Sequence, residues 1–283
     1  MIAGCYGRFI HEEGSFGVKE VLEISNNVDY HTGNIDFPGD VIIYGEVKDR
    51  FTVQSGGSIF CSSTLDAHDV SCKGDLVVTG GIIGRKDGVV KVGGKIRTNF
   101  IENCYVEAEG PIFVKTSVMN SIVNTKGKLT MGKRGTIIGG KIFAQNGVES
   151  AQIGTHNQTR TEINCGVDFS IQQKLFWIKD NQIKLLQKKR KVETMLSMHT
   201  DDLEKLTQLK DEISGKIRKL SEVSIILLER LDKNDAAYVA VSDTVHSGVY
   251  LEICHTSFVV KNPMTKVRFT LNKKMGKIDF KAL

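Results

Sequence analysis

The side chains of this sequence best suited to chemistry are carboxylates. Asp66, Asp69, Asp75 and Asp87 fall within one short stretch. Clustered carboxylates could perform the acid/base steps of polysaccharide hydrolysis, and acids that bind calcium could support a lyase. Asp66 and Asp69, however, bracket two residues of a predicted turn, where aspartate favours local hydrogen bonding. We therefore interpret these acids as residues of solvent-exposed corners.

Two histidines offer a second kind of chemistry. A general-base histidine in a cleft would suit an acyltransferase. His68 and His156 lie in the same region of the chain as the acids. Neither has an evident partner in the sequence, so we interpret both as isolated surface residues.

The segment Gly80–Gly84 is a candidate phosphate site. Its backbone N–H groups, with Arg85 and Lys86 beside them, could receive an anion. The segment lacks the Gly-Lys-Ser/Thr ending of a P-loop, and no strong helix pattern follows it. We therefore interpret it as a structural corner.

The cysteines show no spacing typical of a metal site. None of the six forms a Cys-x-x-Cys pair, and scattered free thiols favour a reducing compartment; they are Cys5, Cys61, Cys72, Cys104, Cys165 and Cys254. No stretch reaches the length of a membrane-spanning helix. The sequence thus predicts a cytoplasmic protein with no catalytic residue, no metal site, no cofactor and no membrane span.

The net charge gives little indication of a nucleic-acid partner. It is only +5 with an isoelectric point near 8.8, and nucleic-acid binding needs a concentrated basic face. The strongest basic run is Lys184, Lys188, Lys189, Arg190 and Lys191. We interpret it mainly as a solvated helix face, with docking of a partner or of an anionic membrane as the alternative.

These groups must be positioned by a repeat that glycine marks. The marker glycines recur at intervals of 16 to 20 residues and are Gly39, Gly57, Gly74, Gly94, Gly110, Gly127 and Gly147. Apolar residues stand two positions after them, at Val41, Ile59, Leu76, Ile96, Ile112 and Leu129. Mostly apolar residues follow four positions after them, at Ile43, Cys61, Val78, Thr98, Val114 and Met131. Four positions before each later marker stand Val53, Val70, Val90, Val106, Val123 and Phe143.

Small and apolar residues at fixed offsets in a short period indicate a solenoid. The period fits a coil of three short strands and three corners. We predict a mainly β protein whose core is a right-handed parallel β-helix of six coils. Asn103 and Asn120 stand at one repeat position and predict a stacked, hydrogen-bonded asparagine pair.

Residues 169–231 change to a helical pattern. The first run, Ile171, Leu175, Ile178, Leu185, Val192 and Leu196, follows a coiled-coil seam that Gln182 and Lys189 interrupt. The second places Leu206, Ile213, Leu220 and Leu227 seven apart, with Leu209 and Val223 between them. Asp201 and Glu204 resemble a capping box at the start of the second helix. The sequence thus predicts an inserted antiparallel coiled-coil hairpin.

The remaining residues return to a strand pattern. We predict the β-helix over 28–167, the hairpin over 168–233, and strands that cap the β-helix over 234–283. A cap is expected because an open coil end exposes unpaired backbone.

Two stretches carry a family resemblance. TGNIDFPGDVIIYGEVKDRFTVQSGGSI, from Thr32 to Ile59, and GGIIGRKDGVVKVGGKIRTNFIENCYVEAEG, from Gly80 to Gly110, resemble the flagellar assembly protein A family. The order of coils, helical hairpin and closing strands is similar, although Ser247 stands where the family tends to carry a proline. The resemblance covers about residues 28–283, and it implies that residues 1–27 are a remnant of an N-terminal region. It implies a right-handed parallel β-helix and a role in assembling or positioning bacterial flagella.

Together these observations predict a non-enzymatic scaffold. Its partners are expected to be proteins, bound through the hairpin at 169–232, with no nucleic acid and with homo-oligomers possible. One alternative is a self-polymerising solenoid similar to the bactofilins, whose terminal coils stack end to end. The other is a β-helix enzyme acting on carbohydrates or transferring acyl groups.

Overall fold

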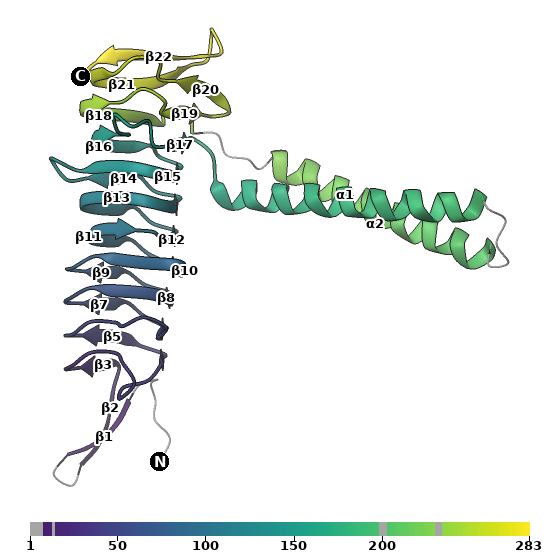
Figure 1. Cartoon of the computed structure of the whole chain (residues 1–283). Helices are drawn as coiled ribbons and strands as arrows, with labels where there is room; N and C mark the ends of the chain where they lie inside the picture. Colours follow the sequence, from purple (N-terminus) through teal and green to yellow (C-terminus); the bar gives the residue numbers. More distant parts are fainter. Residues whose placement is uncertain (1–7, 13–14, 198–202, 230–233) are drawn as a thin grey trace. The chain divides into compact units, whose positions relative to one another are not determined.

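The chain forms two compact units. In this computed structural model the described residues are 8–12, 15–197, 203–229 and 234–283. One unit comprises Met1–Val167 with Lys233–Leu283, and the other is Asp168–Asp232. The first is a β-solenoid of about eight turns, and the second is a hairpin of two packed helices (Figure 1). The predicted mainly β solenoid with a helical hairpin is therefore confirmed.

The strands of the first unit are short and numerous. They are β1 (Arg8–Glu12), β2 (Ser15–Lys19), β3 (Val21–Ile24), β4 (Ile35–Phe37), β5 (Asp40–Ile43), β6 (Thr52–Ser55), β7 (Ile59–Cys61), β8 (Leu65–Cys72), β9 (Leu76–Val78), β10 (Ile82–Val92), β11 (Ile96–Glu102), β12 (Tyr105–Ala108), β13 (Ile112–Thr125), β14 (Leu129–Met131), β15 (Thr136–Ala144), β16 (Val148–Ile153), β17 (Thr161–Cys165), β18 (Tyr238–Val245), β19 (Tyr250–Ile253), β20 (Thr256–Val259), β21 (Met264–Asn272) and β22 (Lys277–Ala282).

Each coil has three faces, and β13 shows all three in one continuous strand. Residues 112–114 pair with β11 and β14, residues 117–119 pair with β11 and β15, and residues 121–125 pair with β12 and β15. All of these pairings are parallel. We call the three segments the first, second and third face in chain order. The same order repeats from coil to coil.

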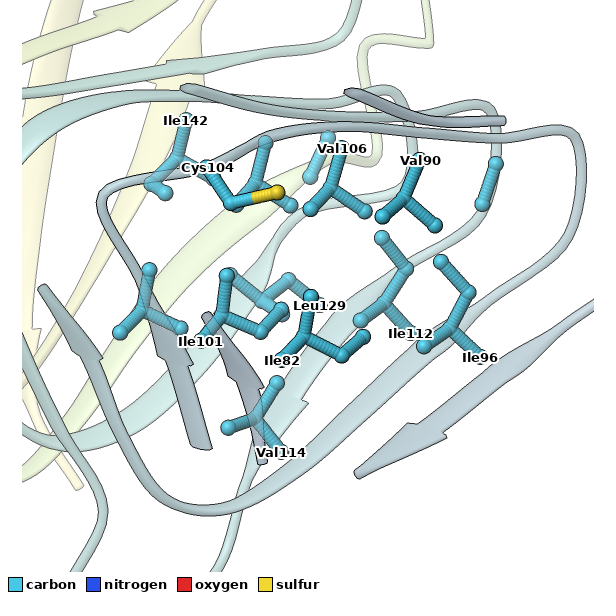
Figure 2. Packing of buried hydrophobic residues seen from close by; sticks show 14 of the residues in the cluster. Ile82, Val90, Ile96, Ile101, Cys104, Val106, Ile112, Val114, Leu129 and Ile142 are labelled. Atoms are coloured by element: carbon cyan, nitrogen blue, oxygen red, sulfur yellow. The ribbon is translucent and has the colours of Figure 1, made fainter. Parts of the chain in front are cut away.

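The interior is filled by the stripes that the sequence predicted. Every residue of the first two stripes is buried, and so are the five valines of the third. Figure 2 shows side chains from the three faces meeting inside the coil, among them Ile82, Val90, Ile112 and Leu129. Packed apolar side chains of this kind leave the interior without polar chemistry.

The last marker of the repeat was assigned wrongly. Val123 pairs with Ile142 and Leu129 with Val148, so the marker position of that coil is Asn146 rather than Gly147. Ile142 is fully buried, whereas Phe143 points outward and its ring lies under the Lys141 ammonium, 4.9 Å from the ring centroid. A slip of one residue moves a strand residue to the opposite side.

Direct stacking explains why the other markers are glycine. The N–H groups of Gly74 and Gly94 each donate to the carbonyl of the marker glycine one coil earlier, at 2.8 Å. A Cβ built on Gly94 would lie 2.8 Å from the carbonyl oxygen of Gly74 and 2.2 Å from a carboxylate oxygen of Asp75. Real Cβ atoms essentially never approach so closely. The repeat therefore reflects backbone packing between coils.

The predicted asparagine ladder is wrong. Asn103 and Asn120 are exposed and have positive φ angles of 50° and 46°. Gly139, the next residue at this position, has a φ of 69°. Asparagine tolerates this left-handed conformation better than other residues with a side chain. The pair therefore recurs because the corner requires that backbone conformation.

The solenoid is longer at both ends than the glycine repeat predicts. β3 lies within residues 1–27, yet it pairs in parallel with β5 and belongs to the coil stack. The start at residue 28 and the count of six coils are therefore wrong. β16 and β18 continue the first face without a marker glycine. The residues at the marker position of these coils are Glu20, Asn146 and Ala237.

The C-terminal strands end the parallel stack. β18 and β19 pair in parallel with β16 and β17. The next strands pair in the antiparallel direction: β20 pairs with β19, and β21 pairs with β18. β22 pairs with β21, also in the antiparallel direction. The N-terminal β1 and β2 form an antiparallel pair of their own.

The second unit consists of α1 (Phe169–Ser197) and α2 (Leu203–Glu229). Gln182 donates to the Ser221 hydroxyl at 3.0 Å, and Lys210 lies 3.9 Å from Glu193. Both pairs have the same residue-number sum, which shows that the helices run antiparallel. The Asp168 carboxylate accepts the N–H of Ser170 and caps α1, whereas the predicted cap Asp201 lies outside the described residues.

The seam between the two helices differs from the prediction at one set of positions on α2. Ile178, Val192 and Ile213 are buried as predicted, but Leu209 and Val223 are more than 40% exposed. The neighbours of the seam on α2 stand four residues after Leu206, Ile213 and Leu220 rather than three; they are Lys210, Ile217 and Ser224. Two residues that look like core by heptad counting are therefore on the surface.

Candidate functional site

The candidate acid Asp66 is held in an ion pair. Arg85, from the enlarged corner of the next coil, donates to Asp66 Oδ2 from Nε at 3.1 Å and from Nη2 at 2.9 Å. Its Nε also lies 3.6 Å from a carboxylate oxygen of Asp49. The side chain of Asp66 is largely buried. This carboxylate thus links successive coils, and its Oδ2 is engaged by Arg85.

The other three candidate acids do not form a catalytic pair with it. The Asp75 carboxylate accepts the Lys95 N–H at 2.9 Å, and this bond lowers the pKa of Asp75. Asp69 and Asp87 are exposed on the surface. The interpretation as solvent-exposed corner residues is wrong for Asp66, which lies within β8 with its side chain largely buried.

The segment Gly80–Gly84 is packed against neighbouring coils. A Cβ on Gly81 would enter the Phe100 ring, and one on Gly84 would lie 2.7 Å from the backbone of Asn103 and Cys104. Arg85, the nearest cation of the segment, is already paired with carboxylates. The corner interpretation is correct only for Gly80 and Gly81, because residues 82–84 belong to β10 and pair in parallel with residues 65–67 of β8.

The described cysteines are buried and free; they are Cys61, Cys72, Cys104, Cys165 and Cys254. Burial raises the pKa of the Cys72 and Cys104 thiols to about 12. A thiol must ionise to act as a nucleophile or as a metal ligand. These side chains therefore fill the core as small hydrophobic residues.

His156 has a partner, so its interpretation as an isolated residue is wrong. Its ring meets that of His246 edge to face, with centroids 4.4 Å apart. His246 is only 3% exposed, and its Nε2 lies 2.7 Å from Nε2 of Gln152. Its Nδ1 is buried and has no hydrogen-bond partner in the described residues. Sequence reasoning missed this pair because the solenoid joins residues on either side of the hairpin insertion.

The buried histidine predicts a pH-dependent stability. Burial lowers the pKa of His246, nearby His156 lowers it further, and Asp243 opposes the change. The folded state then binds fewer protons than the unfolded state, so stability present above the ordinary histidine pKa is lost as the pH falls. We expect the midpoint temperature of thermal denaturation to decrease as the pH is lowered from about 7.5 to 5.5. His246→Asn should remove much of that slope, whereas His68→Asn at an exposed position should retain it. Equal slopes for His246→Asn and the wild type would contradict this assignment.

A groove with a volume of about 640 Å³ lies along the third face. Successive coils contribute Asp36, Gln54, Ser71, Lys91 and Glu107 to it. Acidic, neutral and basic groups follow one another along this row. The groove therefore favours no single class of charged ligand.

The hairpin displays most of the exposed hydrophobic surface. Eighteen large hydrophobic side chains are exposed in the described residues, and eleven of them belong to α1 and α2. They are Phe176, Trp177, Ile183, Leu186, Met195, Leu203, Leu209, Val223, Ile225, Ile226 and Leu228. These residues are the candidates for an interaction surface on the hairpin.

Other site types are not found in the described residues. They contain no group of three or more histidine, cysteine or acidic side chains that could hold a metal ion. Neither described helix is long and apolar enough to span a membrane.

The comparison with known proteins gives one match. A family model described as the Flagellar Assembly Protein A beta solenoid domain matches residues 20–278. No curated protein and no solved structure matches the chain. The match includes β3, in agreement with the earlier start of the coil stack.

Proposed function

The chain belongs to the Flagellar Assembly Protein A family, and from this premise we propose that it is a non-enzymatic scaffold that assembles or positions flagella through protein–protein contacts. The solenoid is the rigid body of this scaffold. The hairpin is its docking arm.

The single observation that carries the proposal is the distribution of exposed apolar side chains. Eleven of the eighteen lie on the hairpin, although its two helices contain 29 and 27 residues of a 283-residue chain. A hairpin that served only as a spacer would gain nothing from exposing them, because solvent exposure of apolar area is unfavourable. The C-terminal half of α2 is the favoured docking segment, since Val223, Ile225 and Ile226 follow closely upon one another there.

The two ends of the hairpin insertion lie side by side in the solenoid. The Asn234 N–H donates to the Gly166 carbonyl at 2.8 Å, so the chain leaves and re-enters the solenoid at adjacent residues. A short turn of glycines in place of residues 168–232 should therefore leave the solenoid folded. This variant separates the arm from the body.

We expect the intact chain to capture flagellar components from a lysate of a flagellated bacterium, and the variant without residues 168–232 to lose them. Val223→Ser/Ile225→Ser/Ile226→Ser should reduce capture strongly. The matched control Tyr44→Ser/Ile122→Ser/Val259→Ser removes exposed apolar groups from the solenoid and should retain capture. Mass spectrometry of the captured proteins is the measurement. Equal recovery with and without the hairpin would exclude it as the docking arm.

Both alternative functions are disfavoured by particular features. End-to-end polymerisation needs two open coil ends, and antiparallel strands follow the last parallel coil at the C-terminal end. Light scattering at high protein concentration tests whether the chain polymerises, and growing filaments would contradict our proposal.

An enzyme needs free catalytic groups, whereas Asp66 and Asp75 are held by Arg85 and Lys95.

We place the protein in the cytoplasm. The five described cysteines are free thiols rather than disulfides. Free thiols persist in a reducing compartment.

A further inference from the structure

The excess positive charge of the chain belongs to one helix. α1 carries seven lysine and arginine residues and two acids, and α2 carries five of each sign. The rest of the chain has 26 basic and 26 acidic residues, so α1 alone accounts for the net charge of +5. A helix face that is merely solvated usually mixes both signs.

The cations gather on the side of α1 that faces away from α2. At 100° per residue, Ile178, Val192 and Gln182 define the seam. The half of α1 that lies outside this seam, which we call the basic arc, carries the exposed cations Lys179, Lys184, Lys188, Arg190 and Lys191. The arc is thus a separate surface from the apolar segment of α2.

Few carboxylates of the protein neutralise the cations of the basic arc. Asp180 pairs with Lys184 at 2.6 Å, and no other carboxylate of the described residues pairs with these five cations. Lys184 and Lys188 stand four residues apart, and Lys188 and Lys191 three. Like charges at these spacings repel and weaken a helix. An anionic surface placed against the helix would relieve this repulsion.

Apolar side chains accompany the cations. Phe176 and Trp177 are 68% and 63% exposed, and Ile183 is 47% exposed, all on the same side of α1. Trp177, Lys184, Lys188, Lys191 and Met195 form a straight row about 27 Å long. Tryptophan prefers the interface between water and lipid, where its ring is half buried.

We propose that the basic arc of α1 binds the surface of a membrane that contains anionic phospholipids. A flat, negatively charged surface meets every cation of a straight row at once. Aromatic and aliphatic side chains can enter the headgroup layer beside it, which is how amphipathic basic helices bind membranes. A nucleic-acid backbone offers the phosphates but no place for Ile183 and Phe176. An acidic protein would have to match the spacing of the row.

The single tryptophan of the chain reports directly on this contact. Trp177 lies on the arc, so its emission should shift to shorter wavelength when the full chain is mixed with vesicles of phosphatidylglycerol and phosphatidylcholine in equal amounts. Vesicles of phosphatidylcholine alone should cause no shift. Each lysine or arginine near an anionic surface is expected to strengthen binding about fivefold. Lys188→Gln/Arg190→Gln/Lys191→Gln should therefore weaken partitioning by roughly a hundredfold.

The matched control removes three cations from the other helix. Lys216→Gln/Arg218→Gln/Lys219→Gln lowers the net charge equally and should reduce partitioning far less. Absence of a shift with anionic vesicles at low salt would overturn the proposal. Equal losses in both triple variants would also overturn it, because binding would then follow net charge alone. Binding to polyglutamate or to DNA without binding to vesicles would assign the arc to an acidic macromolecule instead. None of these measurements needs a flagellar component, so their outcome is independent of the scaffold proposal.

Discussion

Val90→Asp is expected to abolish the cooperative unfolding of the solenoid, whereas Val89→Asp in the same strand should leave it folded. Val90 is fully buried, and Val89 faces outward on the third face. The aspartate at position 90 would have no polar partner among the apolar side chains of the interior. Leaving a buried charge unpaired costs at least about 3–5 kcal/mol, a large part of the stability of a domain.

Thermal unfolding monitored by circular dichroism measures this difference. The Val89→Asp protein should melt cooperatively, a few degrees below the wild type, because it loses only strand propensity and partial burial. Val106 and Ile112 occupy equivalent inward positions and should respond to aspartate as Val90 does. A wild-type melting temperature for Val90→Asp would show that this stripe does not face inward.

The inward stripes could be predicted from the sequence because each coil repeats the same local geometry. Alternation along a strand determines the side on which Val89 and Val90 lie, and the repeat places them in register with other coils. The prediction failed where one residue shifted that register. Gly147 looks like a marker, but the pairing of Leu129 with Val148 makes Asn146 the equivalent residue. The spacing of glycines alone cannot distinguish the two positions.

The candidate surfaces were harder to predict because they depend on three-dimensional neighbours. His246 stands 90 residues after His156, and the pair exists because β18 continues the coil that the hairpin interrupts. On α2, heptad counting assigned Leu209 and Val223 to the seam, whereas helical geometry places Lys210 and Ser224 nearer to it. The exposed apolar set of the hairpin is visible only once the seam is known.

The glycine stack explains the most conspicuous feature of the sequence and is itself open to test. Gly94→Ala is expected to destabilise the solenoid by about 2–4 kcal/mol, since overpacking of a close backbone contact forces neighbouring strands apart. The added Cβ would meet the Gly74 carbonyl, and it would displace the Asp75 carboxylate that accepts the Lys95 N–H. We expect the melting temperature of the solenoid to fall by roughly 5–15 °C.

The same substitution at Gly215 should act in the opposite direction. Gly215 lies within α2, and a Cβ there would meet no atom within 4 Å. Alanine favours a helix over glycine by about 1 kcal/mol, so Gly215→Ala should stabilise the hairpin. Because both variants add one methyl group, a loss at Gly94 with a gain at Gly215 isolates the effect of the coil contact. An unchanged melting temperature for Gly94→Ala would mean that the stack accepts a side chain. In that case close approach between coils would not be the reason why glycine recurs along this chain.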